Sequence, residues 1–145
     1  MTVEYAADLQ GDGVHNLSFQ LWLVDRVPPS PDTARTEVMV WVANRGMQAA
    51  GRRLYHLGKG DGGYDVYESQ RKHLDGEVWR EWNLLTLVAR EERLAGPLDI
   101  GALLMELTRQ RLIARDSWIA NVGLGTEVAA GAGSAAIHGY RVNVH

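Results

Sequence analysis

Residues 36–43, Thr-Glu-Val-Met-Val-Trp-Val-Ala, alternate between two kinds of side chain, and this alternation decides the fold class. Three valines occupy one set of alternate positions, and Glu37, Met39 and Trp41 occupy the other. Successive side chains of a β-strand point to opposite faces, so the pattern predicts a strand with one apolar and one mixed face. Residues 16–24, Asn-Leu-Ser-Phe-Gln-Leu-Trp-Leu-Val, alternate in the same way. They place Gln20 and Trp22 on the face opposite the leucines.

Working outward from these two stretches, we expect a chain rich in strands. Further strands are predicted at 53–57, 64–69, 82–89, 118–128 and 135–144, with turns in the glycine-rich run 58–63 and the small-residue run 129–134. One helix is predicted, with Pro97 in its first turn and an apolar stripe over residues 100–112. No repeat or linker divides the chain, so residues 1–145 are predicted to form a single domain. Its class is all-β: a concanavalin-like β-jelly roll of two packed antiparallel sheets with one outer helix.

Composition excludes several kinds of chemistry. The chain has 145 residues and no cysteine, which excludes a disulfide framework, a thiolate zinc site and a cysteine nucleophile. Its net charge of −3 disfavours nucleic acid and anionic membranes as partners, since both require a basic face. The five histidines are scattered without metal-ligand spacing, so we predict no metal and no cofactor.

Targeting signals are not evident in the sequence. No stretch reaches the roughly 18 apolar residues that a membrane-spanning helix needs. Residues 1–8, Met-Thr-Val-Glu-Tyr-Ala-Ala-Asp, lack the basic start and apolar run of a signal peptide. Composition therefore leaves the localisation undecided.

The mixed faces of two strands point to carbohydrate. A carboxylate beside an indole suits a sugar, which has apolar C–H faces and hydroxyl groups that need acceptors. In the strand at 118–128, one side is expected to carry Ile119, Asn121, Gly123, Gly125 and Glu127. Glycines beside a glutamate leave room for a ligand, and two facing glutamates could form the carboxylate pair of glycoside hydrolysis. The alternative is that each glutamate is simply solvated and that Met39 and Trp41 form a second small core.

Several segments resemble one family. Glu37-Val-Met-Val-Trp41 resembles the Glu-x-Met-Ile-Trp strand of family 12 glycoside hydrolases, which are jelly-roll endoglucanases and xyloglucanases. Gly125-Thr-Glu127 resembles that family's Gly-Thr-Glu segment. Segments 64–67, 84–89 and 139–144 match its remaining pieces in order, and the expected helix falls where the family has its single helix. The resemblance covers about residues 14–144, whereas family members are commonly longer at the N-terminus.

The resemblance implies a function and a site. It implies a retaining endo-β-1,4-glucanase-like hydrolase of β-glucan oligo- or polysaccharides, with Glu37 as nucleophile and Glu127 as general acid/base. Cleft residues expected to bind substrate are Trp22, Met39, Trp41, Gln20 and Asn121. It also suggests a secreted protein, although this chain shows no signal peptide. The shorter N-terminus implies a minimal variant, a fragment, or a protein whose unpaired sheet edges are covered by another chain; self-association through such edges is one expectation.

One departure from the family keeps a second function open. The family usually has an aspartate near the nucleophile, where this chain has Gln20. Glutamine can donate a hydrogen bond to a carboxylate but cannot carry the negative charge. The alternative is a non-catalytic carbohydrate-binding jelly roll derived from a hydrolase. The presence of both glutamates favours the enzyme.

Overall fold

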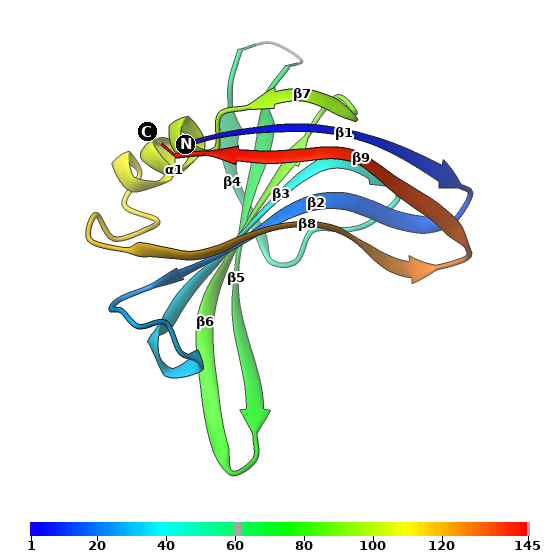
Figure 1. Ribbon diagram of the computed structural model, residues 1–145. Helices are drawn as coiled ribbons and strands as arrows, with labels where there is room; N and C mark the ends of the chain where they lie inside the picture. Colours follow the sequence, from blue (N-terminus) through cyan, green and yellow to red (C-terminus); the bar gives the residue numbers. More distant parts are fainter. Residues whose placement is uncertain (60–61, 145) are drawn as a thin grey trace.

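Two β-sheets pack face to face, and one helix lies outside them (Figure 1). The computed structural model describes residues 1–59 and 62–144. The smaller sheet has the strand order β7-β1-β9, and the larger has the order β4-β5-β6-β3-β2-β8. The strands are β1 Thr2–Gly11, β2 Val14–Val24, β3 Ala34–Arg45, β4 Arg52–Leu57, β5 Tyr64–Asp75, β6 Val78–Ala89, β7 Ala95–Leu98, β8 Trp118–Ala130 and β9 Gly133–Asn143; the helix is α1 Ile100–Arg109. The prediction of an all-β sandwich with one outer helix is confirmed.

The centre of the larger sheet is formed by the strands whose alternation was read from the sequence. β2 runs antiparallel to both β3 and β8, and Trp22 lies opposite Glu37 on one side and Asn121 on the other. β3 and β6 run parallel, with Glu37 opposite Leu84. This parallel pair brings together segments more than forty residues apart in the sequence, and it determines what surrounds Glu37.

The main core lies between the sheets and is built from the predicted apolar faces. Phe19 is fully buried, and the ring of Tyr5 from β1 packs edge-on against it at 5.0 Å between centroids. The other large side chains in this layer include Leu17, Leu21 and Leu23 of β2, Val38, Val40 and Val42 of β3, and Leu85 and Leu87 of β6. The polar residues of β2 consequently point away from the smaller sheet. We call the side to which they point the outer face of the larger sheet.

Strand β1 differs from the sequence-based expectation. No strand is predicted before residue 16, yet β1 is the middle strand of the smaller sheet. Its buried residues Val3, Tyr5, Ala7 and Leu9 do alternate. The connection from β1 to β2 packs against the connection from β8 to β9. A Cβ on Gly131 would lie 2.6 Å from the Cα of Gly13, so both positions need glycine.

The helix begins later than predicted. Its N-cap is Asp99, whose Oδ1 accepts the Ala102 backbone N–H at 2.9 Å. Pro97 belongs to β7, opposite Glu4, and not to the helix. An edge strand tolerates proline because one side of its backbone needs no partner. No helix among the described residues is long and apolar enough to cross a membrane.

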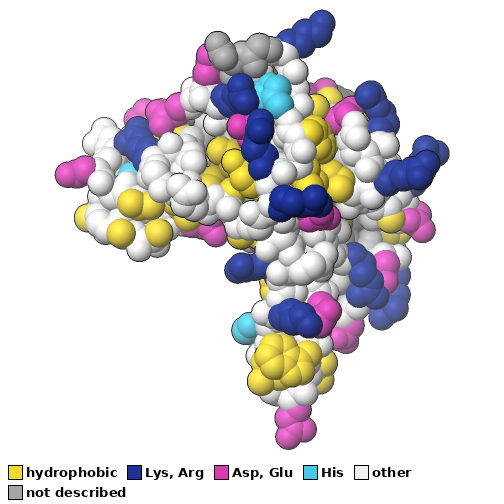
Figure 2. All heavy atoms as spheres, turned by 180° about the vertical axis from the view of Figure 1, so that it is seen from behind, with side chains coloured by type: hydrophobic (Ala, Val, Ile, Leu, Met, Phe, Trp, Pro, Cys, Tyr) yellow, Lys and Arg dark blue, Asp and Glu magenta, His cyan; other side chains and the backbone are white. Residues whose placement is uncertain are grey.

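The β5–β6 hairpin is longer than its predicted strands and projects from the sandwich (Figure 1). Its pairing continues to Asp75 and Val78. An apolar patch near its tip is visible in Figure 2, where Leu74, Val78 and Trp79 are exposed. The turn predicted at 58–63 connects β4 to β5, and its central residues, 60 and 61, lie outside the described residues.

Candidate active site

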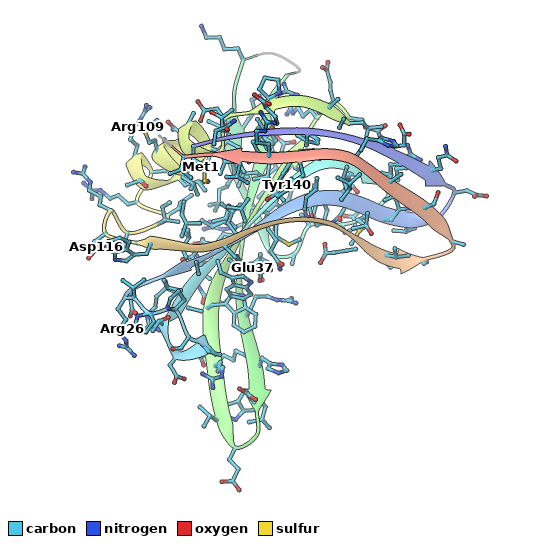
Figure 3. The ribbon with its side chains drawn as sticks, viewed as in Figure 1. Met1, Arg26, Glu37, Arg109, Asp116 and Tyr140 are labelled. Atoms are coloured by element: carbon cyan, nitrogen blue, oxygen red, sulfur yellow. The ribbon has the colours of Figure 1, made fainter. Side chains whose placement is uncertain are left out.

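Glu37 lies in the middle of the outer face and is held by two uncharged donors (Figure 3). Its side chain comes from β3, and only 7% of the residue is exposed. Gln20 Nε2 donates to Glu37 Oε1 at 2.5 Å, and the indole Nε1 of Trp82 donates to Glu37 Oε2 at 2.8 Å. The expected contact between Gln20 and Glu37 is confirmed. Both donors fix the direction of the carboxylate oxygens.

Glu127 is held differently. It lies on β8 directly opposite Asn16 of β2. Asn16 Nδ2 donates to Glu127 Oε2 at 2.7 Å, and the Glu127 backbone N–H donates to Asn16 Oδ1 at 3.1 Å. Asn16 is completely buried, whereas Glu127 is exposed. One carboxylate of the pair is therefore enclosed, and the other remains open to solvent.

The two glutamates share the outer face but come from different strands, Glu37 from β3 and Glu127 from β8. β2 lies between β3 and β8, and both glutamates pair with residues on the polar side of β2. A hollow of about 190 Å³ is lined by Glu127, Ser18, Met39 and Gln20, the residue that holds Glu37. The space above Gly125 is empty, because a Cβ there would meet no atom within 4 Å. This matches the room for a ligand expected beside Glu127.

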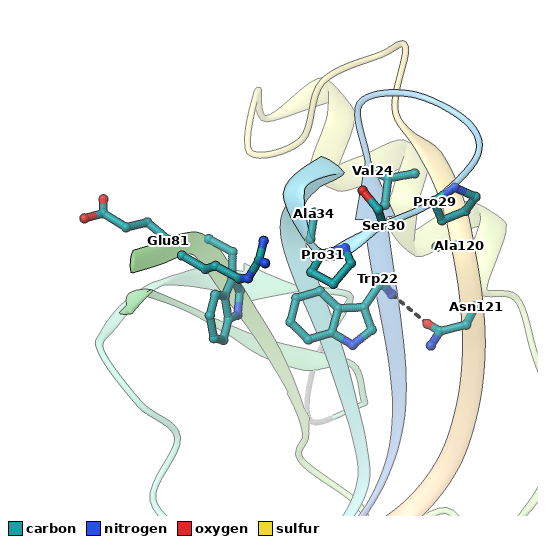
Figure 4. A pocket seen from close by; sticks show the side chains of 11 residues that line it. Trp22, Val24, Pro29, Ser30, Pro31, Ala34, Glu81, Ala120 and Asn121 are labelled. Atoms are coloured by element: carbon teal, nitrogen blue, oxygen red, sulfur yellow. Dashed lines mark hydrogen bonds between the residues drawn. The ribbon is translucent and has the colours of Figure 1, made fainter. Parts of the chain in front are cut away.

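A second hollow, of about 350 Å³, lies along the same face beyond Glu37 (Figure 4). Trp22 and Trp82 line it, with their ring centroids 5.4 Å apart and their planes tilted by 59°. Asn121 lines the pocket from β8, directly beside Trp22, and its Oδ1 accepts the backbone N–H of Trp22 at 3.0 Å. The remaining lining residues are Val24, Pro29, Ser30, Pro31, Ala34, Arg80, Glu81 and Ala120. We call this hollow the tryptophan pocket.

Trp41 does not line this pocket, and its surroundings agree with the alternative expectation of a second small core. The residue is 4% exposed and packs with Met39 and Leu84 in a second small hydrophobic cluster. The chain between β3 and β4 covers this cluster with Met47, Ala49 and Ala50. Asn44 holds that connection by hydrogen bonds to both backbone groups of Met47. Met39 belongs to the same cluster, but it also borders the hollow beside Glu127.

The structure corrects the position of Ile119. An irregularity in the pairing of β2 with β8 falls between Trp22 and Leu23, so Asn121 pairs with Trp22 but Ile119 pairs with Leu23. Ile119 consequently lies on the opposite side from Asn121 and borders a hollow beside α1 together with Leu23 and Leu104. Because one extra residue is inserted in β8 at this point, the residues that precede it point to the side of the sheet opposite to the one that strict alternation predicts.

Two site residues were missed by the sequence analysis. Asn16 was read only as one of the polar positions of its strand, and Trp82 only as the start of a strand. The available signal for Asn16 was its polarity beside Gln20 in a strand that carries site residues. No local signal singled out Trp82, because its contact with Glu37 depends on β3 pairing with β6. Among the described residues, no three His, Asp or Glu side chains form a group that could hold a metal ion; His145 lies outside them.

Comparisons with known proteins agree with this architecture. No protein-family model matches the chain, and no curated protein matches it in sequence. Among solved structures, the family 12 xyloglucanase from Bacillus licheniformis superposes with a TM-score of 0.88 at 20% identity, over 99% of this chain and 62% of that one. An endo-1,4-β-glucanase, CelB2, gives 0.79 at 18% identity, over 97% of this chain and 60% of that one. A structure from a comparison of two major endo-1,4-β-xylanases of Trichoderma reesei superposes with a TM-score of 0.74 at 15% identity, over 96% of this chain and 75% of that one.

These likenesses identify the class of fold: a two-sheet jelly roll of the kind found in small glycoside hydrolases. More particularly, the chain has the fold of the family 12 xyloglucanases and endoglucanases, as the resemblance of its strands implied. It spans about three-fifths of the length of these two family 12 structures.

Proposed function

We propose that this protein is a retaining glycoside hydrolase of the endo-β-1,4-glucanase type that acts on β-glucan polysaccharides. The observation that carries the proposal is the difference between the surroundings of its two glutamates. Glu37 is enclosed and held by two N–H donors, while Glu127 lies exposed on the same face beside a hollow that Gln20 also lines. A fixed anion and an accessible carboxyl group are the two components that double displacement requires.

In the first step, an oxygen of the Glu37 carboxylate forms a bond to the anomeric carbon. The bond from that carbon to the glycosidic oxygen breaks, and this oxygen takes the proton of Glu127. In the second step, Glu127 takes a proton from water as the water oxygen attacks the anomeric carbon, and the ester bond to Glu37 breaks. Each carboxyl group returns to its starting state, and the β-configuration is kept.

Substrate binding is assigned to both hollows. Trp22 offers a half-buried indole face in the tryptophan pocket, and apolar contact with a sugar ring acts through the area it buries. Asn121 and Gln20 supply amide groups that suit hydroxyls, and Met39 borders the second hollow. Two similar structures contain ligands: the family 12 xyloglucanase from Bacillus licheniformis has one in its complex, and the xyloglucanase domain of NopAA from Sinorhizobium fredii binds cellobiose.

A non-catalytic carbohydrate-binding jelly roll is the second candidate, and Gln20 favours it. Its amide donates to Glu37 and cannot exchange a proton with the carboxylate, as an aspartate in that place could. Under this alternative, both hollows bind sugar, and the glutamates serve only as hydrogen-bond acceptors.

Release of reducing ends from soluble β-glucans distinguishes the two. The wild-type protein is expected to release reducing ends. Glu37→Gln is expected to lose at least about 1,000-fold in kcat, because no nucleophile remains. Glu77→Gln, at an exposed position, is the control and is expected to behave as wild type. Proton NMR of fresh product is expected to show the β-anomer first. Sugar binding by the wild type without any hydrolysis would support the binding module, and the absence of both would refute both candidates.

A further inference from the structure

Each oxygen of Glu37 is connected to a different part of the outer face. Oε1 is bound by Gln20, which lines the hollow beside Glu127. Oε2 is bound by Trp82, whose ring lines the tryptophan pocket. From this division we infer that Trp82 is a positioning residue that couples occupancy of the tryptophan pocket to the orientation of Glu37. The inference rests on the proposed function, because it concerns the group proposed to be the nucleophile.

Trp82 can serve two sites because of where its strand places it. β6 pairs with β3 so that Leu84 lies opposite Glu37, and Trp82 lies two residues earlier on the same side of the strand. From this position its Nε1 reaches Glu37 Oε2 at 2.8 Å. Its ring meets Trp22, which lies opposite Glu37 on the other neighbouring strand. Glu37 is therefore flanked by the two indoles, of which only Trp82 donates to it among the described contacts.

The indole transmits position because it is rigid. Its N–H lies in the ring plane, so any shift of the ring against a bound sugar also shifts the hydrogen bond to Glu37. Trp82 is half-buried and directly precedes Asn83, the first residue of β6 that pairs with β3, so its ring is not enclosed as a core side chain is. A sugar in the tryptophan pocket presses on Trp22 and Trp82 together. We therefore expect it to fix Trp82 and, with it, the carboxylate that attacks.

Three variants separate the two roles of Trp82, as a wall of the tryptophan pocket and as a hydrogen-bond donor to Glu37. Trp82→Phe keeps a ring in the pocket and removes the N–H, and it is expected to lower kcat about 10- to 100-fold while changing KM less than about twofold. Trp82→Gln keeps an N–H donor and removes the ring, and it is expected to retain more kcat than Trp82→Phe but to raise KM. Trp22→Leu, the matched control, removes the other wall, leaves the donor in place and is expected to raise KM with the smaller effect on kcat.

A readout independent of activity is the indole N–H resonance of Trp82, assigned by triple-resonance NMR in the wild-type protein. It is expected to move upfield in Glu37→Gln, because a charge-assisted hydrogen bond becomes a neutral one. Cellotetraose added to Glu37→Gln is expected to shift the Trp82 and Trp22 indole signals together. An unchanged Trp82 signal in Glu37→Gln would overturn the inference, as would a Trp82→Phe variant with wild-type kcat and raised KM. A wild-type protein without hydrolysis would refute the proposed function, and the NMR result would still decide whether Trp82 holds Glu37.

Discussion

Asn16 and Glu127 are joined by two hydrogen bonds that run in opposite directions. The Asn16 amide nitrogen donates to the carboxylate, and the Asn16 amide oxygen accepts the backbone N–H of Glu127. The two residues are 111 positions apart in the sequence and lie opposite each other on β2 and β8. A completely buried side chain thus fixes both the strand position and the carboxylate direction of the exposed glutamate. Asn16 is therefore expected to matter for the acid step without touching substrate.

Asn16→Ala is expected to lower kcat on β-glucan and to cost about 1–3 kcal/mol of unfolding free energy, because it removes two hydrogen bonds and empties space at a completely buried position. Activity on an aryl β-cellobioside with a good leaving group should fall less, since such a group departs without a proton from Glu127. The comparison needs kcat on both substrates and urea unfolding. Equal losses on the two substrates would contradict a role through Glu127.

Gln20→Asp is expected to move the acid limb of the pH–rate profile to higher pH. A second carboxylate close to Glu37 disfavours its ionisation, and it replaces the donor that now binds Oε1 at 2.5 Å. The measurement is kcat/KM against pH for both proteins, with Gln70→Asp on the exposed hairpin as the control. Superimposable profiles would show that position 20 does not influence Glu37 in solution.

The tryptophans of β2 and β3 are expected to respond differently to truncation. Trp41→Ala should cost about 3–5 kcal/mol of stability, because it empties the small cluster with Met39 and Leu84. Trp22→Ala should cost less stability and raise KM for oligosaccharides about tenfold, since its ring lines the pocket. Urea denaturation and steady-state kinetics test both variants. A large stability loss for Trp22→Ala with unchanged KM would make that residue part of the core instead.

Tyr5 makes stability sensitive to alkaline pH. Burial raises its pKa to about 12, with Tyr64 adding to the effect and Arg93 opposing it, and its hydroxyl donates to the Arg93 carbonyl at 2.7 Å. Between pH 10 and about 12 the folded chain keeps a proton that the unfolded chain has lost. The free energy of unfolding should therefore fall over this range by on the order of 1–2 kcal/mol, with part of the effect screened by solvent.

Tyr5→Phe should reduce this decline, and Tyr67→Phe should keep it. Burial also raises the pKa of Tyr55, Tyr64 and Tyr140, so these groups account for the part that remains. Guanidinium unfolding at several values between pH 9.5 and 12 measures the difference. A decline of the same size in Tyr5→Phe would assign the alkaline sensitivity to other groups.

Edge strands of the two sheets are unequally protected, which bears on self-association. β7 has four residues and includes Pro97, and β4 is short and begins with Arg52 and Arg53. β8 has thirteen residues, of which only Glu127 is charged, and β9 is also a long edge strand. Long, weakly charged edges favour pairing with another strand. We predict that copies of this chain associate through β8.

Light scattering across a concentration series is expected to show a mass above the monomer. Val128→Lys, at a position 60% exposed on β8, should shift the protein toward monomer, whereas Ala95→Lys on β7 should not. A monomer at every concentration would refute this association.

Local alternation alone was sufficient to predict the central strands and the two faces of each. It placed Glu37 and Gln20 on one face and the leucines and valines on the other, because side-chain direction in a strand is set by its period of two. The contact between Gln20 and Glu37 could be anticipated from those positions. Strand β1 carries the same alternation, although no strand is predicted there.

Only the tertiary structure decided which strands are neighbours and what covers each face. The parallel pairing of β3 with β6 brings Trp82 to Glu37, and the pairing of β2 with β8 brings Asn16 to Glu127. The connection after β3 folds back over Trp41 and turns an expected binding residue into a core residue. None of this is encoded in a window of the sequence, because a strand's period sets which side of the sheet a residue faces and long-range packing sets what it meets there.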